Sequence, residues 1–161
     1  MSNALRNSGR DIVFSICMWE YKDWMPKIAN LWRTTFDIGP EWISTSWYRG
    51  VYEIIDANNK YWQIAKPGHW NDPDMLVVGK VGWSDHLRDS RLTPDEQYTH
   101  ITLWSLLAAN MLIGCDIAQI DDFTFNLLCN NEVNAVNQDI LGRQAHRDVN
   151  EDGMQIWSRH L

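Results

Sequence analysis

Short apolar runs alternate with helical patterns four times within about 140 residues of this chain. The first run, 12–17, is almost continuous in apolar residues, which is typical of a strand buried on both faces of a parallel sheet. Later runs lie at 32–38, 74–78 and 112–117. Because strands that alternate with helices form parallel sheets, the sequence predicts an α/β protein.

Helical patterns fill the segments between these runs. Over 41–56, apolar residues fall at the spacing i, i+4, i+7 and i+8 of an amphipathic helix, namely Trp47, Val51, Ile54 and Ile55. The sequence Thr-Pro-Asp-Glu at 93–96 is a helix start, and it predicts a helix that runs to about residue 111. Weaker patterns predict helices over 24–31 and 123–129 and a further turn over 132–137.

Four strand–helix units are half of an eight-fold β/α barrel, which takes about 250 residues when complete. The predicted fold is therefore a partial (β/α)8 barrel over residues 1–141. Half a barrel leaves two open edges, so an open doubly wound sheet stays as an alternative. No predicted strand is followed by a glycine-rich phosphate loop, which weighs against a nucleotide-binding sheet. The polar tail, 142–161, predicts a β-hairpin that starts a separate β domain.

Composition narrows the classes of partner. Lys and Arg number 14 against 21 Asp and Glu, and the net charge of −7 argues against nucleic acid. No apolar stretch reaches the roughly 18 residues of a membrane span, so no membrane partner is expected. The three cysteines form no C-x-x-C pair, which indicates neither a zinc site nor a disulfide scaffold. The ten tryptophans offer flat apolar surfaces that suit sugar rings, although core packing accounts for more than half of them.

Ligand-binding residues of a parallel β/α fold lie at the carboxyl ends of its strands. After the first predicted strand come Met18, Trp19 and Glu20, and Asp116 follows the fourth. Along the second strand, the two-residue period places Arg33, Thr35 and Asp37 on one face. These residues point into a pocket, or Arg33 and Asp37 form a structural ion pair, or Asp37 caps the next helix.

The stretch Trp70–Met75 carries two carboxylates beside aromatic rings, a combination suited to hydroxyl-rich ligands. Pro73 favours an extended conformation at Asp72, so Asp72 and Asp74 are expected to point the same way. Alternatively, Asp72 only satisfies backbone donors in a tight loop. No metal or cofactor is predicted, because hard cations need several oxygen ligands and no D-x-D-x-D-G loop is present. His86 and His100 are interpreted as surface or packing residues.

Five stretches of the chain resemble, in order, motifs of glycoside hydrolase family 27, the α-galactosidases and α-N-acetylgalactosaminidases. They are IVFSICMW at 12–19, LWRTTFDI at 31–38, GHWNDPDML at 68–76, LWSLLAA at 103–109 and EVNAVNQD at 132–139. The resemblance implies a retaining hydrolase with a β/α barrel and a carboxyl-terminal β-sandwich. It identifies the four strands as the last four of the barrel and 142–161 as the start of the sandwich.

The resemblance also implies residue roles. Asp37 matches the general acid/base, and Arg33 matches a residue that contacts sugar hydroxyls. Asp74, Met75 and Trp70 match the motif that lines the pocket, and Trp19 matches an aromatic wall. Two departures concern Met18, which stands where the family has a Glu that holds the sugar 2-hydroxyl, and Phe36, which stands where a small residue is common. Glu20 is a candidate substitute for the missing Glu.

The family's nucleophile is an Asp in a Y-x-K-x-D motif, which this sequence lacks. The chain is therefore expected to be a fragment that begins after the nucleophile strand and is inactive alone. The expected partner is an α-galactoside or related carbohydrate, and the open barrel edges also allow association with another copy. By resemblance, the parent protein is secreted, periplasmic or lysosomal. The alternatives are a non-catalytic sugar-binding module and a structural half-barrel.

Overall fold

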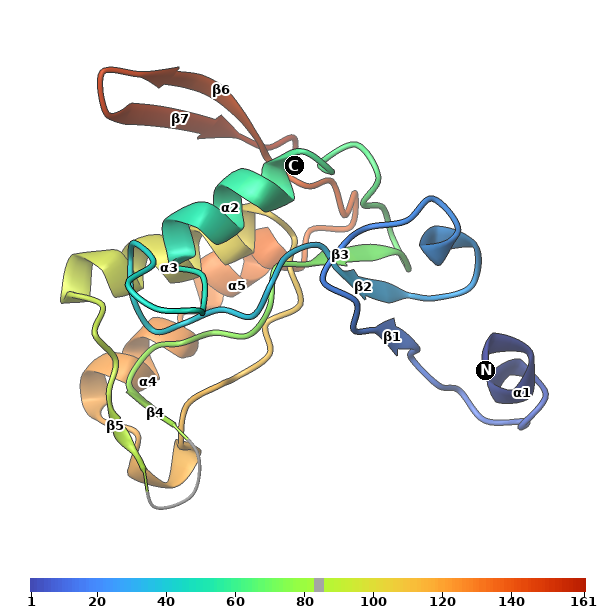
Figure 1. Cartoon of the computed structure of the whole chain (residues 1–161), viewed down its shortest axis with the longest axis horizontal. Coiled ribbons are helices and arrows are strands. Elements are labelled where there is room, and N and C mark those ends of the chain that lie inside the picture. The colour runs from blue at the N-terminus through green and yellow to red at the C-terminus, as the bar shows by residue number, and fades with distance from the viewer. Residues whose placement is uncertain (83–85) are drawn as a thin grey trace.

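The computed structural model describes residues 1–82 and 86–161, and a small parallel sheet lies beside its larger helices (Figure 1). Strands β1 (Ser15–Ile16), β2 (Leu31–Arg33) and β3 (Trp70–Asp72) lie in that order. Their register pairs Ile16 with Trp32 and Arg33 with Asp72. The prediction of parallel strands is confirmed, although β1 and β2 are shorter than the apolar runs that predicted them.

The third and fourth strand predictions are wrong in position. The third strand precedes 74–78, because Pro73 has no N–H to donate and the ladder stops at Asp72. Beyond it, Leu76 forms one isolated parallel bridge with Ile113. Over 112–116 the only strand-like pairings among the described residues are isolated bridges at Ile113 and Cys115, and Ile113 is exposed. The bridges of this segment reach Leu76 and Val81, which lie in one stretch of the chain.

The helix predicted over 41–56 is wrong in its first half, since α2 spans Val51–Asn59. Residues 41–50 form a loop in which the buried Glu41 carboxylate accepts hydrogen bonds from the Thr45 N–H (3.1 Å) and the Thr45 hydroxyl. Such local bonds compete with helical ones. At Gly50 a Cβ would lie 2.4 Å from the Trp42 carbonyl oxygen, so the turn into α2 needs glycine. Trp47, expected on the buried stripe, is 74% exposed.

Helix α3 (Pro94–Leu106) begins as predicted and ends earlier than predicted. Thr93 Oγ1 accepts from the Glu96 N–H at 3.3 Å, and Glu96 Oε2 accepts from the Thr93 N–H at 2.7 Å, which is a capping box. The helix stops because Ala108 has a φ of 50°, outside the helical region. The remaining helices are α1 (Ser2–Arg6), η1 (Met25–Lys27), η2 (Ile117–Gln119), α4 (Asp122–Leu128) and α5 (Asn131–Asn137).

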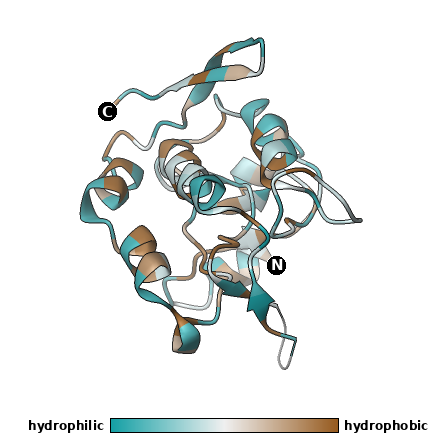
Figure 2. Cartoon of the chain, turned by 90° about the vertical axis from the view of Figure 1, so that its left-hand side faces the viewer, coloured by the Kyte–Doolittle hydropathy of each residue, from teal (hydrophilic) through white to brown (hydrophobic). Residues whose placement is uncertain are grey.

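The main core lies between α2, α3 and the segment after β3. Its fully buried side chains include Ile54, Val77 and Trp104. A smaller cluster beside β1 and β2 contains Met25 and Trp32. In Figure 2 the apolar residues gather along the helices and inner segments, whereas the carboxyl-terminal hairpin is largely hydrophilic. That hairpin, β6 (His146–Glu151) and β7 (Met154–Ser158), confirms the predicted tail structure.

The hairpin is joined to the end of α2 by polar contacts. The Arg147 N–H donates to Asn59 Oδ1 at 3.0 Å, and the Arg147 guanidinium pairs with Asp56 at 2.9 Å. A second antiparallel pair, β4 (Lys80–Val81) and β5 (Arg88–Asp89), was not predicted. Among the described helices, none is both long and apolar enough to cross a membrane.

His100 is a packing residue, as predicted, and it makes the fold sensitive to acid. It is fully buried, its Nε2 accepts from the Val77 N–H at 3.1 Å, and its ring meets Trp104 edge-on at 4.1 Å. Burial lowers the pKa of His100 to about 3. The folded state therefore keeps this ring neutral down to a pH at which the unfolded chain has already bound a proton.

We expect the free energy of unfolding to fall below about pH 6.5, by up to about 1.4 kcal/mol per pH unit from this group. The contribution of the neutral His100 ring to the free energy of unfolding is complete above the pKa of His in the unfolded chain. It is lost as pH falls from there towards the pKa of His100 in the folded state. Urea titrations between pH 7 and 4.5 measure the slope. In His100→Phe the slope should become shallower, whereas exposed His160→Gln should leave it unchanged. If His100→Phe had the same slope as the parent chain, His100 would not be the source of this acid sensitivity.

Candidate functional site

One guanidinium joins two carboxylates at the carboxyl ends of neighbouring strands. Arg33, the last residue of β2, has a side chain that is 8% exposed. Its Nη2 lies 3.1 Å from Asp37 Oδ1 and 2.8 Å from Asp74 Oδ2. The same nitrogen donates to the Thr35 carbonyl oxygen at 3.2 Å. The structure thus brings Arg33, Asp37 and Asp74 together, and we call these three residues the Arg33 cluster.

Asp74 is held by hydrogen bonds to both carboxylate oxygens. Oδ1 accepts from the Met75 N–H at 2.8 Å, and Oδ2 accepts from the Ile38 N–H at 2.9 Å. Its backbone N–H donates to Asp72 Oδ1 at 2.8 Å, and its carbonyl oxygen accepts from Trp104 Nε1 at 2.8 Å. A φ of 85° is uncommon for a non-glycine residue, and these contacts hold it there.

The two carboxylates of the Arg33 cluster differ in burial and availability. The Asp74 side chain is 15% exposed, and burial raises its pKa above the ordinary value, although the Ile38 N–H and the Arg33 charge pull it down. The Asp37 side chain is 43% exposed. Its Oδ1 accepts from Arg33, while its Oδ2 has no hydrogen bond from residues 1–82 or 86–161. Asp74 is therefore a fixed buried group, and Asp37 can reach a ligand.

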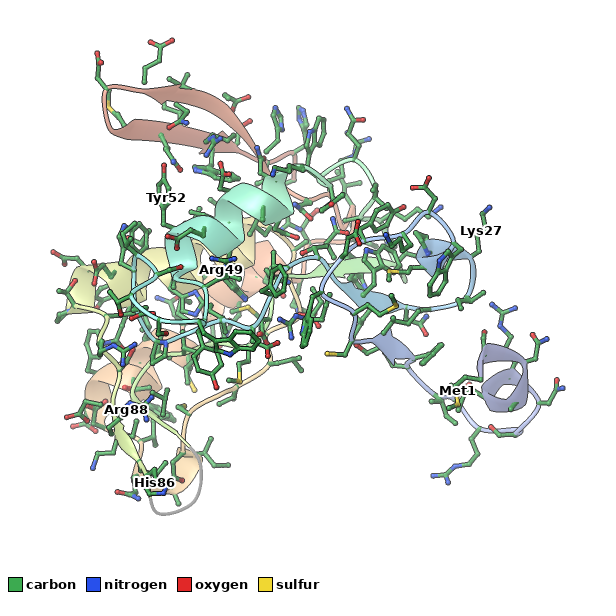
Figure 3. All side chains as sticks on the ribbon, in the orientation of Figure 1. Met1, Lys27, Arg49, Tyr52, His86 and Arg88 are labelled. Atoms are coloured by element: carbon green, nitrogen blue, oxygen red, sulfur yellow. The ribbon has the colours of Figure 1, made fainter. Side chains whose placement is uncertain are left out.

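An aromatic surface adjoins Asp37. Trp19, which follows β1 and is 49% exposed, stacks on Phe36 with a centroid distance of 5.7 Å and an interplanar angle of 26°. The Arg49 guanidinium lies 5.4 Å from the Phe36 ring centre. Arg49 is labelled among the side chains in Figure 3. The Arg49 N–H also donates to the Asp37 carbonyl oxygen at 2.9 Å. A flat apolar face beside an available carboxyl group can bind a sugar ring and exchange a proton with it.

The two-residue period that placed Arg33, Thr35 and Asp37 on one face does not continue past Arg33, because β2 ends there. Phe36 can therefore lie beside Trp19. Met75 packs its side chain at Gly114, where a Cβ would lie 2.7 Å from the Met75 sulfur. Arg49 was not predicted as part of this site, because 41–56 was interpreted as a helix. Arg49 reaches this site through the hydrogen bond from its N–H to the Asp37 carbonyl oxygen, which no sequence pattern indicates.

Other predicted residues do not join the Arg33 cluster. Trp70 lies at the opposite end of β3, where its ring packs at Gly142, so this arrangement does not support a place for Trp70 in the same site. Glu20 is exposed and pairs with Lys22 at 2.7 Å, outside the Arg33 cluster.

Two further acidic side chains satisfy backbone donors instead of facing the site. Asp72 is buried and accepts from the Asp74 N–H, as in the alternative interpretation of that residue. Asp116 accepts from the Ala118 N–H at 2.9 Å and so caps η2. In the part of the chain that the structure describes, no three His, Cys, Asp or Glu side chains are grouped to hold a metal ion.

Comparison with protein families gives a match over most of the chain. The family model described as Alpha galactosidase A, or Melibiase_2, matches residues 1–139. Alpha-galactosidase 2 of Arabidopsis thaliana is 44% identical over the whole chain, which covers 38% of that protein. The α-galactosidase of Cyamopsis tetragonoloba is 42% identical, and the chain covers 36% of it.

Solved structures give the same picture. Alpha-galactosidase I from Mortierella vinacea superposes with a TM-score of 0.88 at 30% identity, over 100% of this chain and 43% of that one. The α-galactosidase of Saccharomyces cerevisiae with raffinose gives 0.83 at 28% identity, over 98% of this chain and 39% of that one. A β-L-arabinopyranosidase from Geobacillus stearothermophilus superposes with a TM-score of 0.80 at 29% identity, over 97% of this chain and 36% of that one. The chain spans less than half the length of each of these proteins.

Proposed function

Since the chain belongs to the α-galactosidase family, glycoside hydrolase family 27, we propose that it is the carboxyl-terminal half of the catalytic barrel of a retaining α-glycosidase. Residues 1–141 supply about the last four βα units, and 142–161 begin a β-sandwich. The substrate is terminal α-linked galactose or a related sugar. Two features support the half barrel: β1 has only β2 as a partner among the described residues, and Ile113 is exposed beside its single bridge.

The observation that carries this proposal is the pairing of Arg33 with two carboxylates of unequal availability. Asp37 acts as general acid/base through its free oxygen, and Arg33 holds the other oxygen in place. Asp74 fixes Arg33 and the Ile38 backbone, and it is a positioning residue because its oxygens are already engaged. Trp19 and Phe36 supply the flat wall for the sugar or its leaving group.

The reaction follows from these roles. Asp37 gives its proton to the glycosidic oxygen while a second carboxylate attacks the anomeric carbon, and the bond to the leaving group breaks. Asp37 then takes a proton from water, whose oxygen replaces the attacking carboxylate. That second carboxyl group must lie about 5 to 5.5 Å from the first. Asp74 is not free to attack, so the nucleophile belongs to a part of the enzyme outside this chain.

We expect no hydrolysis of 4-nitrophenyl α-galactoside by this chain alone. In a chimera in which residues 1–161 replace the matching segment of the Arabidopsis thaliana enzyme, which is 44% identical there, we expect turnover. Release of nitrophenol is the measurement, and circular dichroism verifies that the chimera is folded.

Turnover by the pure chain that disappears in Asp37→Asn would refute the assignment of the nucleophile to another segment. A folded chimera that binds galactose in calorimetric titration without turnover would instead support a non-catalytic sugar-binding role. That alternative uses the same Trp19 and Phe36 wall and needs no nucleophile.

A further inference from the structure

A cavity of about 320 Å³ lies between the connection that follows α2 and the carboxyl-terminal segment. Its lining includes five cationic or titratable basic side chains, and no Asp or Glu lines it. These are Lys66, Arg143, His146, Arg159 and His160. The chain as a whole has a net charge of −7, so a cavity lined by basic and no acidic side chains differs in charge from the rest of the molecule.

Two of these cations have no partner. The side chains of Lys66 and Arg143 make no hydrogen bond or ion pair with residues 1–82 or 86–161, and both residues are exposed. His146, in contrast, pairs with Asp148 at 2.8 Å and stacks on Trp62 with a centroid distance of 4.4 Å. The cavity therefore has two unpaired charges at its rim and an aromatic pair in its wall.

Arg159 has an unused bidentate edge. Its Nη1 donates to the Ser105 carbonyl oxygen at 2.6 Å, whereas Nε and Nη2 are shielded from water and find no partner in the described part of the chain. Nε and Nη2 form the side of the guanidinium that grips two oxygens of a carboxylate, phosphate or sulfate. Burial lowers the pKa of Arg159, and the charge of the Asp139 carboxylate opposes this effect. An unpaired, shielded donor costs stability that an anion can restore.

The cavity wall is held in place by buried amides. Gln144 Oε1 accepts from Asn71 Nδ2 at 2.8 Å, and Gln144 Nε2 donates to the Asn58 carbonyl oxygen at 3.4 Å. These bonds fix the segment that carries Arg143 and His146 against β3 and the end of α2. A preformed wall means that a ligand does not have to order the chain on binding.

We propose that this cavity is a binding site for an oxyanion group of the phosphate or sulfate class. Lys66 and Arg143 contact the anion, and Arg159 turns its Nε–Nη2 edge towards it. The lining of this cavity includes none of the residues of the Arg33 cluster. The proposed anion site therefore shares no residue with the sugar site.

Titration of the chain with inorganic phosphate and with sulfate at constant ionic strength, followed by ¹H–¹⁵N NMR, tests the proposal. We expect saturable shifts of the Trp62 indole and Arg159 Nε signals. Lys66→Gln and Arg143→Gln should each weaken binding about tenfold. Lys60→Gln removes the same charge from an exposed position outside the cavity lining and should leave binding unchanged.

Arg159→Gln also removes a bond to α3, so the Lys66 and Arg143 variants, whose side chains bond no described residue, decide the question. Galactose 6-sulfate is compared with inorganic sulfate to separate the two sources of the anion. Tighter binding of the former assigns a sugar-borne anion, and equal binding assigns a free one. Equal affinity of Lys66→Gln, Arg143→Gln and Lys60→Gln, or no shift at Trp62 and Arg159, overturns the site.

Discussion

Replacing Arg33 by leucine is expected to lower the free energy of unfolding by about 3–5 kcal/mol, the usual cost of removing one partner of a buried ion pair. The Arg33 side chain is 8% exposed and is the cation that Asp37 and Asp74 share. Its loss leaves the mostly buried Asp74 carboxylate without a counter-charge. Urea denaturation at pH 7 measures the change, and an unchanged m-value verifies that the two states remain comparable.

The pH dependence of this variant follows from Asp74. Burial already raises the pKa of Asp74, and removal of the Arg33 charge raises it further. A raised folded pKa favours the neutral acid, so the variant should be least destabilised near pH 4 and lose stability as pH rises through the folded pKa. Lys22→Leu, which breaks the exposed pair with Glu20, should cost at most about 1 kcal/mol. An Arg33→Leu cost no larger than that of Lys22→Leu would disprove the buried cluster.

Replacing Asp37 by asparagine in the chimeric enzyme is expected to lower kcat/KM for raffinose about 10²- to 10⁴-fold, the range typical of lost general acid catalysis. Asparagine keeps the size and an oxygen for Arg33 but cannot give a proton to the leaving sugar. Because Asp37 is 43% exposed and Asp74 keeps its own bonds, the fold should be little affected.

The matched control for this change is Asp89→Asn, which alters an exposed carboxylate in β5, away from the Arg33 cluster. Its kcat/KM should equal that of the parent chimera. Equal thermal unfolding of the Asp37 and Asp89 variants excludes misfolding as the cause. If Asp37→Asn kept more than a tenth of the parent kcat/KM for raffinose, Asp37 would not be the acid.

The structural features that the sequence predicts correctly are those that depend on residues close together in the chain. The capping box at Thr93 and Glu96 fixed the start of α3, and the polar tail formed the expected hairpin. Arg33 and Asp37 came together because four residues at a strand end stay within reach of each other. The family resemblance, drawn from motifs at such strand ends, is confirmed by the match over residues 1–139.

The errors have a common physical origin in contacts that are distant in sequence or absent. The Glu41 carboxylate accepts from Thr45 and from Arg91, 50 positions away, and this arrangement turns a helical pattern into a loop. The apolar run near Ile113 forms only isolated bridges, from Ile113 to Leu76 and from Cys115 to Val81, and no continuous ladder among the described residues. Trp70 belongs to the motif that predicted a pocket residue. Its pairing with Leu31 of β2 places it at the start of β3, away from the end that carries the Arg33 cluster.

The leaving-group dependence of the Asp37→Asn chimera tests the central assignment most directly. A 2,4-dinitrophenyl leaving group departs without protonation, so its kcat/KM should stay within about threefold of the parent chimera while that for raffinose falls 10²-fold or more. Added azide, which attacks without a general base, should raise kcat for the dinitrophenyl substrate. If kcat/KM fell equally for both substrates and azide had no effect, Asp37 would be a structural residue and not the acid/base.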